Sequence, residues 1–285
     1  MLRKFQAFVS ATFLLILGLG APARASDYHS PRTAALGGAG HAGPMLNDSI
    51  YLNPSFVSLV QTYAASVGYN TYSGEGTNPN DYHGMGYNVG IQDGRSELFQ
   101  AGVGLTSRED FQILSIGASK QVVQQIGIGL GGKFVRARVL NADGFWEGSA
   151  SSTWVINNYT QVSLTIDNLL ETANGRANGF YREIVAGSKF NAAGAVQVYF
   201  DPHVVPSLND SFGVELGFEV PVMKDFYARV GTFRNSLIPF ANVRGRGFAV
   251  GLGWIGPRIS FDYGLEHALE PVSALNHVFG MTIFF

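Results

Sequence analysis

The chain has 285 residues, of which 46% are hydrophobic and only 14% are charged, with 36 Gly and no Cys. This composition excludes a disordered chain, a disulfide-stabilised scaffold and a metal site built on cysteine. After the first 25 residues the sequence has no run of about 18 uninterrupted apolar residues, the length that a transmembrane helix needs. A helical membrane protein is therefore excluded as well.

The amino terminus has the features of a cleaved export signal. Arg3 and Lys4 precede an apolar stretch, and Ala23-Arg24-Ala25 offers the small-x-small pattern found before a cleavage site. We therefore expect residues 1–25 to be a signal peptide. Without its three basic residues the chain keeps 16 basic against 21 acidic residues, a net charge of −5, which argues against binding to nucleic acid. The absence of cysteine is typical of a bacterial envelope protein.

Apolar residues alternate with small or polar ones along most of the mature chain. The clearest stretch is 212–220, in which Phe, Val, Leu, Phe and Val are separated by Gly, Glu, Gly and Glu. Residues 99–106, 161–167 and 259–266 follow the same pattern. The second face of a soluble sandwich would be rich in Lys, Glu and Thr, whereas here it is mostly Gly, Ser and Gln. This pattern indicates a barrel whose apolar face contacts outer-membrane lipid.

The alternating stretches predict fourteen strands, and long and short connections alternate between them. Outer-membrane barrels have this arrangement because their periplasmic turns are short and their outer loops are long. We therefore predict an all-β fold, a transmembrane antiparallel β-barrel of about 14 strands over residues 61–285. Twelve strands would remain if the weak stretches 148–157 and 180–190 are loops. The predicted strands lie near 62–72, 82–92, 96–107, 110–119, 123–135, 148–157, 159–168, 180–190, 192–201, 210–220, 223–233, 245–255, 257–266 and 275–285.

The carboxyl terminus carries a pattern of its own. The chain ends on Phe285, with Ile283, Met281 and Phe279 at the alternate positions before it. This ending resembles the terminal-strand signal that the bacterial barrel-assembly machinery reads. We therefore expect that machinery to be a partner during insertion into the outer membrane. An ordinary last strand of a soluble β domain would leave the export signal and the alternating loops unexplained.

Residues 26–60, before the first strand, do not alternate. Asn53 and Pro54 resemble a helix start, with Asn as the cap and Pro at the first helical position, and Phe56, Val57 and Leu59 follow as a short apolar turn. The segment is too apolar to remain in water. We therefore expect it to fold against the rest of the chain.

Here the sequence resembles the long-chain fatty acid transporter (FadL) family of outer-membrane barrels and its PorV-like relatives. The resemblance is carried by ALGGAG at 35–40, Asp48, YLNPS at 51–55, IDNLL at 166–170 and the strands from Phe212 to Arg234 and from 247 to the end. It implies that 26–60 is a plug inside the barrel, with Asp48, Asn53, Pro54 and Phe56 as its motif, and that a hydrophobic molecule diffuses through the lumen and leaves by a side opening. Ser55 departs from the Ala that is usual in the family.

The remaining motifs give no sign of catalysis. Two matches to G-x-G-x-x-G, at 38–43 and 127–132, do not lie between a buried strand and a helix, so dinucleotide binding is rejected. The six His show no metal-ligand spacing, and no Ser–His arrangement points to a hydrolase. We therefore expect no enzyme activity, no cofactor and no metal. Inward-facing charges are expected to pair in a structural network between wall and plug, with a substrate or ion pathway as the alternative. These charges are Lys133, Glu215, Glu219, Arg229, Asp262 and Glu266.

Two functions of different classes remain open. The first is passage of a hydrophobic or amphipathic small molecule across the outer membrane, and the second is a plugged barrel that serves as a platform or shuttle for secreted proteins. Inward glycines, Gly102 and Gly104 among them, permit two explanations. They leave room for a hydrophobic cargo, or they let the plug approach the wall closely.

Overall fold

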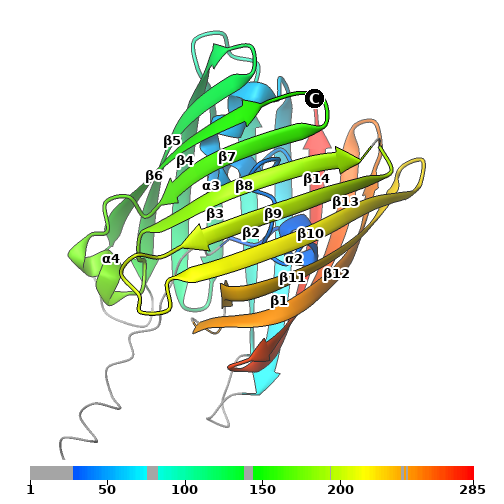
Figure 1. The fold of residues 1–285 in the computed structure, drawn as a ribbon. Helices are drawn as coiled ribbons and strands as arrows, with labels where there is room; N and C mark the ends of the chain where they lie inside the picture. Colours follow the sequence, from blue (N-terminus) through cyan, green and yellow to red (C-terminus); the bar gives the residue numbers. More distant parts are fainter. Residues whose placement is uncertain (1–27, 76–82, 138–143, 193, 239–240, 242) are drawn as a thin grey trace, which may run out of the picture.

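The computed structural model describes residues 28–285 apart from 76–82, 138–143, 193, 239–240 and 242. The predicted signal peptide, residues 1–25, lies outside the described residues. Figure 1 shows a single ring of strands with the amino-terminal part of the described chain inside it.

Among the described residues, fourteen antiparallel strands close a barrel, as the sequence predicts. Each strand pairs with its neighbours in the chain, and β1 pairs with β14, for example through Val67 opposite Met281. Most of the stretches 148–157 and 180–190 lies in strands β6 and β8, so the twelve-stranded alternative is wrong. The strands are β1 Tyr63–Glu75, β2 Gly84–Asp93, β3 Gln100–Arg108, β4 Phe111–Val123, β5 Ile126–Ala137, β6 Phe145–Val155, β7 Thr160–Asp167, β8 Glu183–Ala192, β9 Val196–Val204, β10 Phe212–Met223, β11 Phe226–Ile238, β12 Val243–Ile255, β13 Ile259–Glu270 and β14 Ser273–Phe284.

The period of two along each strand sorts the side chains between the two faces of the wall. In β10, Phe212 is exposed outward whereas Gly213, Gly217 and Glu219 are buried inside. The outer face carries large exposed hydrophobic side chains on many strands, such as Ile91, Leu130, Leu252 and Phe279. An apolar belt of this extent is stable only against lipid, so the wall has the character of an outer-membrane barrel.

Two connections are shorter than the sequence predicts. The prediction places loops over 235–244 and 267–274, but β11 continues to Ile238, β12 begins at Val243, and β13 and β14 are separated by two residues only. Arg246 and Glu270 form an exposed ion pair across β12 and β13 in this extension. The alternation of apolar residues marks the part of a strand that faces lipid, and the hydrogen-bonded ladder extends beyond it. The predicted ends of these strands were therefore wrong.

Residues 28–60, called the inner segment below, lie within the ring of strands (Figure 1). They contain the helices α2 (Pro31–Ala35) and α3 (Asp48–Leu52) and the 3₁₀ helix η1 (Pro54–Leu59). α2 contacts β11 to β14, and η1 contacts β3 to β6. α2 begins at a capping box, in which the side chains of Ser30 and Thr33 satisfy each other's backbone N–H groups. None of the described helices is long and apolar enough to cross a membrane.

The start of η1 departs from the expected capping. Pro54 is at the first helical position, as predicted, but the side chain of Asn53 makes no capping hydrogen bond. Instead its amide donates to the carbonyl oxygen of His41 and to Oγ1 of Thr153 on β6, and its carbonyl accepts from Oγ of Ser55. Tertiary hydrogen bonds to the wall replace the local cap, so that part of the prediction was wrong.

The position of Phe285 suggests a test of the predicted assembly signal. The backbone N–H of Phe285 donates to the carbonyl oxygen of Tyr63 at 3.0 Å, so this residue completes the seam between the first and last strands. We expect Phe285→Lys, or its deletion, to reduce insertion severalfold because a charge or a gap replaces the aromatic side chain at the membrane interface. Heat-modifiable migration of the protein in outer-membrane fractions measures insertion. Ser273→Lys, at the exposed far end of β14, is the control, and equal insertion of the two variants would count against the signal.

Candidate functional site

The inward glycines stand where the inner segment touches the wall. A Cβ atom on Gly102 would lie 2.5 Å from Cγ1 of Ile50, and one on Gly104 would lie 2.0 Å from Oη of Tyr51. Gly129 faces backbone, since its Cβ would lie 2.3 Å from N of Ser55. No side chain fits in these gaps. The space beside these glycines is thus filled by the inner segment, which is the second of the two explanations that the sequence left open.

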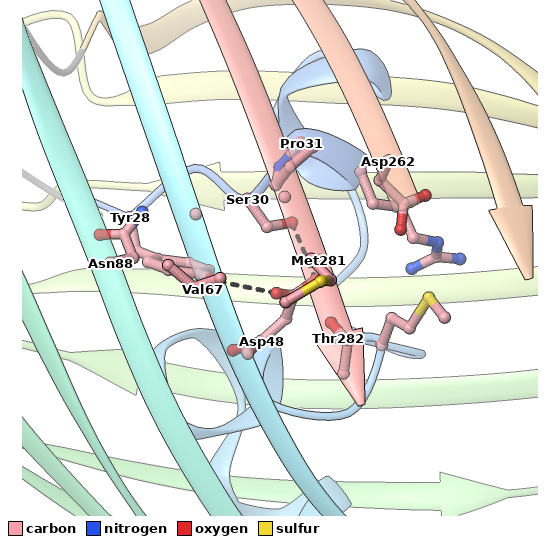
Figure 2. A pocket seen from close by; sticks show the side chains of 14 residues that line it. Tyr28, Ser30, Pro31, Asp48, Val67, Asn88, Asp262, Met281 and Thr282 are labelled. Carbon is pink, nitrogen blue, oxygen red and sulfur yellow. Dashed lines mark hydrogen bonds between the residues drawn. The ribbon is translucent and has the colours of Figure 1, made fainter. Parts of the chain in front are cut away.

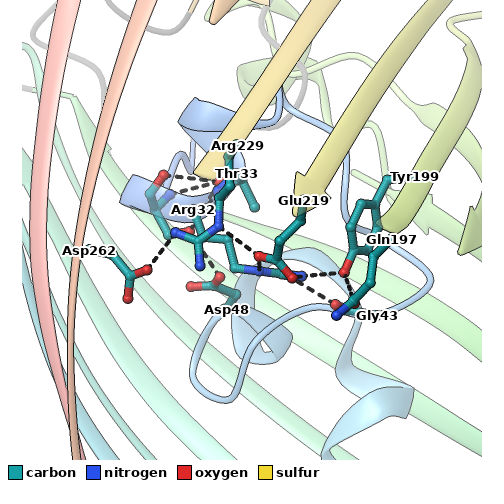
Figure 3. Close-up of polar contacts among 10 residues, drawn as sticks. Arg32, Thr33, Gly43, Asp48, Gln197, Tyr199, Glu219, Arg229 and Asp262 are labelled. Carbon is teal, nitrogen blue, oxygen red and sulfur yellow. Dashed lines mark hydrogen bonds and ion pairs between the residues drawn. The ribbon is translucent and has the colours of Figure 1, made fainter. Parts of the chain in front are cut away.

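The predicted inward charges Glu219, Arg229 and Asp262 form one network with Arg32 of α2 (Figure 3). Nε of Arg32 donates to Oε2 of Glu219 at 3.0 Å, and Nε of Arg229 donates to the same oxygen at 2.6 Å. Nη1 of Arg229 donates to Asp262 at 2.5 Å, and Nη2 of Arg32 donates to the hydroxyl of Tyr199. Two guanidinium groups therefore balance two carboxylates inside the barrel, as a dry interior requires.

The other predicted charges have separate environments. Lys133 of β5 pairs with Asp167 of β7 at 2.6 Å, and both belong to the wall. Glu266 of β13 pairs with His29 of the inner segment at 2.9 Å. Glu215 makes no hydrogen bond or ion pair with any residue that the structure describes. The expectation of pairing between the wall and the inner segment thus describes Glu219 and Glu266 but not Lys133 or Glu215.

Asp48 joins the start of the inner segment to α3. It accepts hydrogen bonds of 2.8 Å from the hydroxyls of Tyr28 and Ser30, and the Tyr28 ring stacks on Tyr51 with ring centroids 3.8 Å apart. Burial raises the pKa of Asp48 to about 6, against the hydrogen bonds, which lower it. Phe56, the last residue of the predicted motif, is buried in η1. These residues therefore hold the fold of the inner segment together.

Asp201 on β9, which the sequence did not single out, fixes the turn between α2 and α3. Its Oδ2 accepts from the backbone N–H groups of Gly40 and His41 at 2.7 and 2.8 Å and lies 3.0 Å from Nδ1 of His41. Burial alone would lower the pKa of His41, but Asp201 raises it to about 9. The sequence offers one signal for Asp201, because this residue stands at an inward-facing position of a strand in which apolar and polar residues alternate. Arg32 and Tyr199 were missed as well, because neither has a local motif.

Cavities between the inner segment and the wall are small. The cavity in Figure 2 lies against β1 and β14, is lined by Tyr28, Ser30, Asp48 and Thr282, and encloses about 30 Å³. That is room for a water or two, far below the roughly 300–1,000 Å³ of a small-molecule site. A larger hollow of about 430 Å³, beside Phe99 and Leu130, lies on the lipid-facing side of the wall. Where the described residues line it, the lumen is therefore closed in this conformation.

Solved structures of similar fold include channels for hydrocarbons. The chain matches the CymD monoaromatic hydrocarbon channel with 14% identity and a TM-score of 0.66, over 90% of this chain and 96% of that one. It matches the Ralstonia pickettii toluene transporter TbuX with 12% identity and a TM-score of 0.67, over 91% and 99%. A Pseudomonas aeruginosa FadL homologue matches with 10% identity and a TM-score of 0.59, over 90% and 98%. No family model and no curated protein matches the sequence.

The class that the fold defines is thus the closed antiparallel β-barrel with an apolar outer belt. Within that class, the chain shares its fold with these hydrocarbon channels and with the FadL homologue along nine-tenths of its length, which confirms the predicted resemblance at the level of the fold.

The Arg32 network makes a prediction about docking of the inner segment. Arg32→Ala removes the donors to Glu219, Tyr199 and the carbonyl oxygen of Gly43, and loss of one partner of a buried ion pair costs about 3–5 kcal/mol. We expect protease to cleave the inner segment much faster in this variant while the barrel resists. Arg246→Ala is the control, because its ion pair with Glu270 is exposed and contributes at most about 1 kcal/mol. Equal cleavage rates in the two variants would show that Arg32 does not anchor the segment.

Proposed function

We propose that this protein passes a hydrophobic or amphipathic small molecule across the bacterial outer membrane, with the inner segment as its plug. The observation that carries the proposal is the combination of a hydrocarbon-channel fold with a lumen that is filled by a separate segment of the chain and not by side chains of the wall. A molecule can cross such a barrel only when the inner segment moves.

The wall behind the inner segment suits an apolar cargo. Ile50 lies against Gly102, and Pro54 lies against Gly117 and Gly131. Displacement of α3 and η1 would uncover the inner faces of strands that carry glycines and small hydroxyl side chains, such as Ser115, Ser151 and Thr153. An acyl chain or a small aromatic ring could then enter the space that the inner segment leaves, at the cost of desolvating small hydroxyls and not paired charges.

The polar anchors lie mostly on the opposite side of the barrel. Arg32 and His41 bind carboxylates on β9 and β10, and His29 binds Glu266 on β13. This asymmetry supports a hinge-like motion in which the α2 side stays attached while the η1 side moves. Asn53 and Ser55, which bind Thr153 on β6, are then the contacts that must break.

The platform function gains no support from the comparisons, whose named functions are those of channels and transporters. We also propose that the protein has no catalytic role, because the similar structures are named as channels and transporters. Export through a cleaved signal peptide and insertion by the barrel-assembly machinery complete the proposal, with outer-membrane lipid around the apolar belt.

A reversible lock on the inner segment tests the proposal. Oγ of Ser55 and Oγ1 of Thr153 are 2.8 Å apart, and the native chain has no cysteine, so Ser55→Cys with Thr153→Cys places two thiols where they can form the single disulfide. We expect oxidised cells with this double variant to take up labelled toluene and oleate no faster than cells without the protein. Reductant should restore uptake, because the η1 side is released.

The two single-cysteine variants are the controls, and thiol labelling reports whether the disulfide has formed. Undiminished uptake with a complete disulfide would exclude motion at η1 as the gate. Uptake that is the same in cells with and without the wild-type protein, across fatty acids and small aromatics, would contradict transport itself.

A further inference from the structure

A second, very small cavity lies between the inner segment and the wall near β8 and β10. It encloses about 10 Å³, and His29, His41, Glu183 and Glu215 are among the residues that line it. A volume of this size accommodates one water-sized particle. Its lining is dominated by ionisable groups.

Two residues that line this cavity, His41 and Glu215, converge with Asp201, which lies beside it. A nitrogen of His41, a carboxylate oxygen of Asp201 and one of Glu215 all lie within 4.8 Å of one another. His41 is 5% exposed and Asp201 is 0% exposed. Nδ1 of His41 faces Asp201, whereas Nε2 has no hydrogen-bond partner among the described residues. Oδ1 of Asp201 accepts only a long bond of 3.3 Å from the backbone of Ser188.

Glu215 is the unexplained member of the cluster. It projects inward from β10 and makes no hydrogen bond or ion pair within the described part of the chain. Gly38, with a positive φ of 91°, makes room for it, since a Cβ there would lie 2.6 Å from Oε1 of Glu215. The backbone of the inner segment is therefore shaped around a carboxylate that has no partner.

The charge balance of the cluster is also incomplete. The neighbouring Glu183 is balanced by Arg244 at 2.7 Å, with His203 at 3.8 Å, and Glu266 is bonded to His29. Asp201 and Glu215 form no ion pair with an arginine or lysine among the described residues, and the imidazoles of His41 and His203 are the basic groups that act on Glu215. Two buried carboxylates without an arginine or lysine are costly, so this cavity requires additional positive charge.

We propose that the cavity binds one divalent transition metal, with Zn²⁺ as its representative, through His41, Asp201 and Glu215. One imidazole and two carboxylates form a donor set that Zn²⁺ accepts, and a water would complete the tetrahedral shell. The ion would join the inner segment to β9 and β10. It would therefore stabilise the closed lumen. The expectation from sequence that no metal is bound rested on spacing along the chain alone.

Metal content of the purified full-length protein tests the site. Protein carrying a tag without histidine is stripped with chelator, incubated with ZnCl₂, dialysed and measured by inductively coupled plasma mass spectrometry. We expect about one Zn²⁺ per chain in the wild type and a loss of about tenfold or more in Glu215→Gln and in His41→Gln, since each removes a ligand. His29→Gln, which lines the same cavity but is bonded to Glu266, is the matched control and should retain the ion.

Heat-modifiable migration confirms the folding of each variant. If His41→Gln fails to fold, Glu215→Gln decides the outcome, because glutamine keeps the shape of the glutamate side chain. Zn²⁺ should also slow proteolysis of the inner segment in the wild type but not in Glu215→Gln. Wild-type protein that retains no Zn²⁺ would mean that a proton alone supplies the missing charge. Equal retention by the wild type and Glu215→Gln would place the metal elsewhere, and either result overturns the proposal.

Discussion

Fourteen strands enclose a lumen that is wider than their own side chains can fill, since about eight strands is the size at which inward side chains meet. The rest of the interior follows from this constraint. The inner segment occupies the space, so the wall beside it consists of glycines such as Gly104 and Gly129, and charged groups of the segment become buried. Each of these charges then needs a partner on the wall, which Arg32 finds in Glu219 and His29 finds in Glu266.

The sequence predicts the wall well because the signal is local. Alternation in β10 or β13 depends on adjacent residues, and it locates the strands and their inward faces. Strand ends such as Ile238 and Glu270 were misplaced because ladder hydrogen bonds continue where lipid contact stops. The partners of the inner segment could not be predicted, since Arg32 and Glu219 are 187 positions apart and no pattern links them. Asn53 shows the same limit, because a distant Thr153 outcompetes its local capping role.

The contacts of the inner segment are unequal around the barrel, and this inequality gives the proposed transport its physical basis. Paired charges hold the α2 side, whereas α3 and η1 rest on glycines through Ile50, Tyr51 and a few hydroxyl contacts. Breaking neutral hydrogen bonds costs less than separating buried ions. The η1 side is therefore the part of the closed lumen that can open at the lowest cost.

Hydrogen exchange of the backbone amides in the inner segment, with and without a hydrocarbon, decides most directly whether this segment is a movable plug. We expect the amides of residues 28–60 to exchange slowly in the free protein, and those of α3 and η1 to exchange faster when toluene is present, while the strands stay unchanged. Rapid exchange of the segment without hydrocarbon would contradict a filled lumen. Unaltered exchange with a hydrocarbon that cells take up through this protein would contradict a plug that moves.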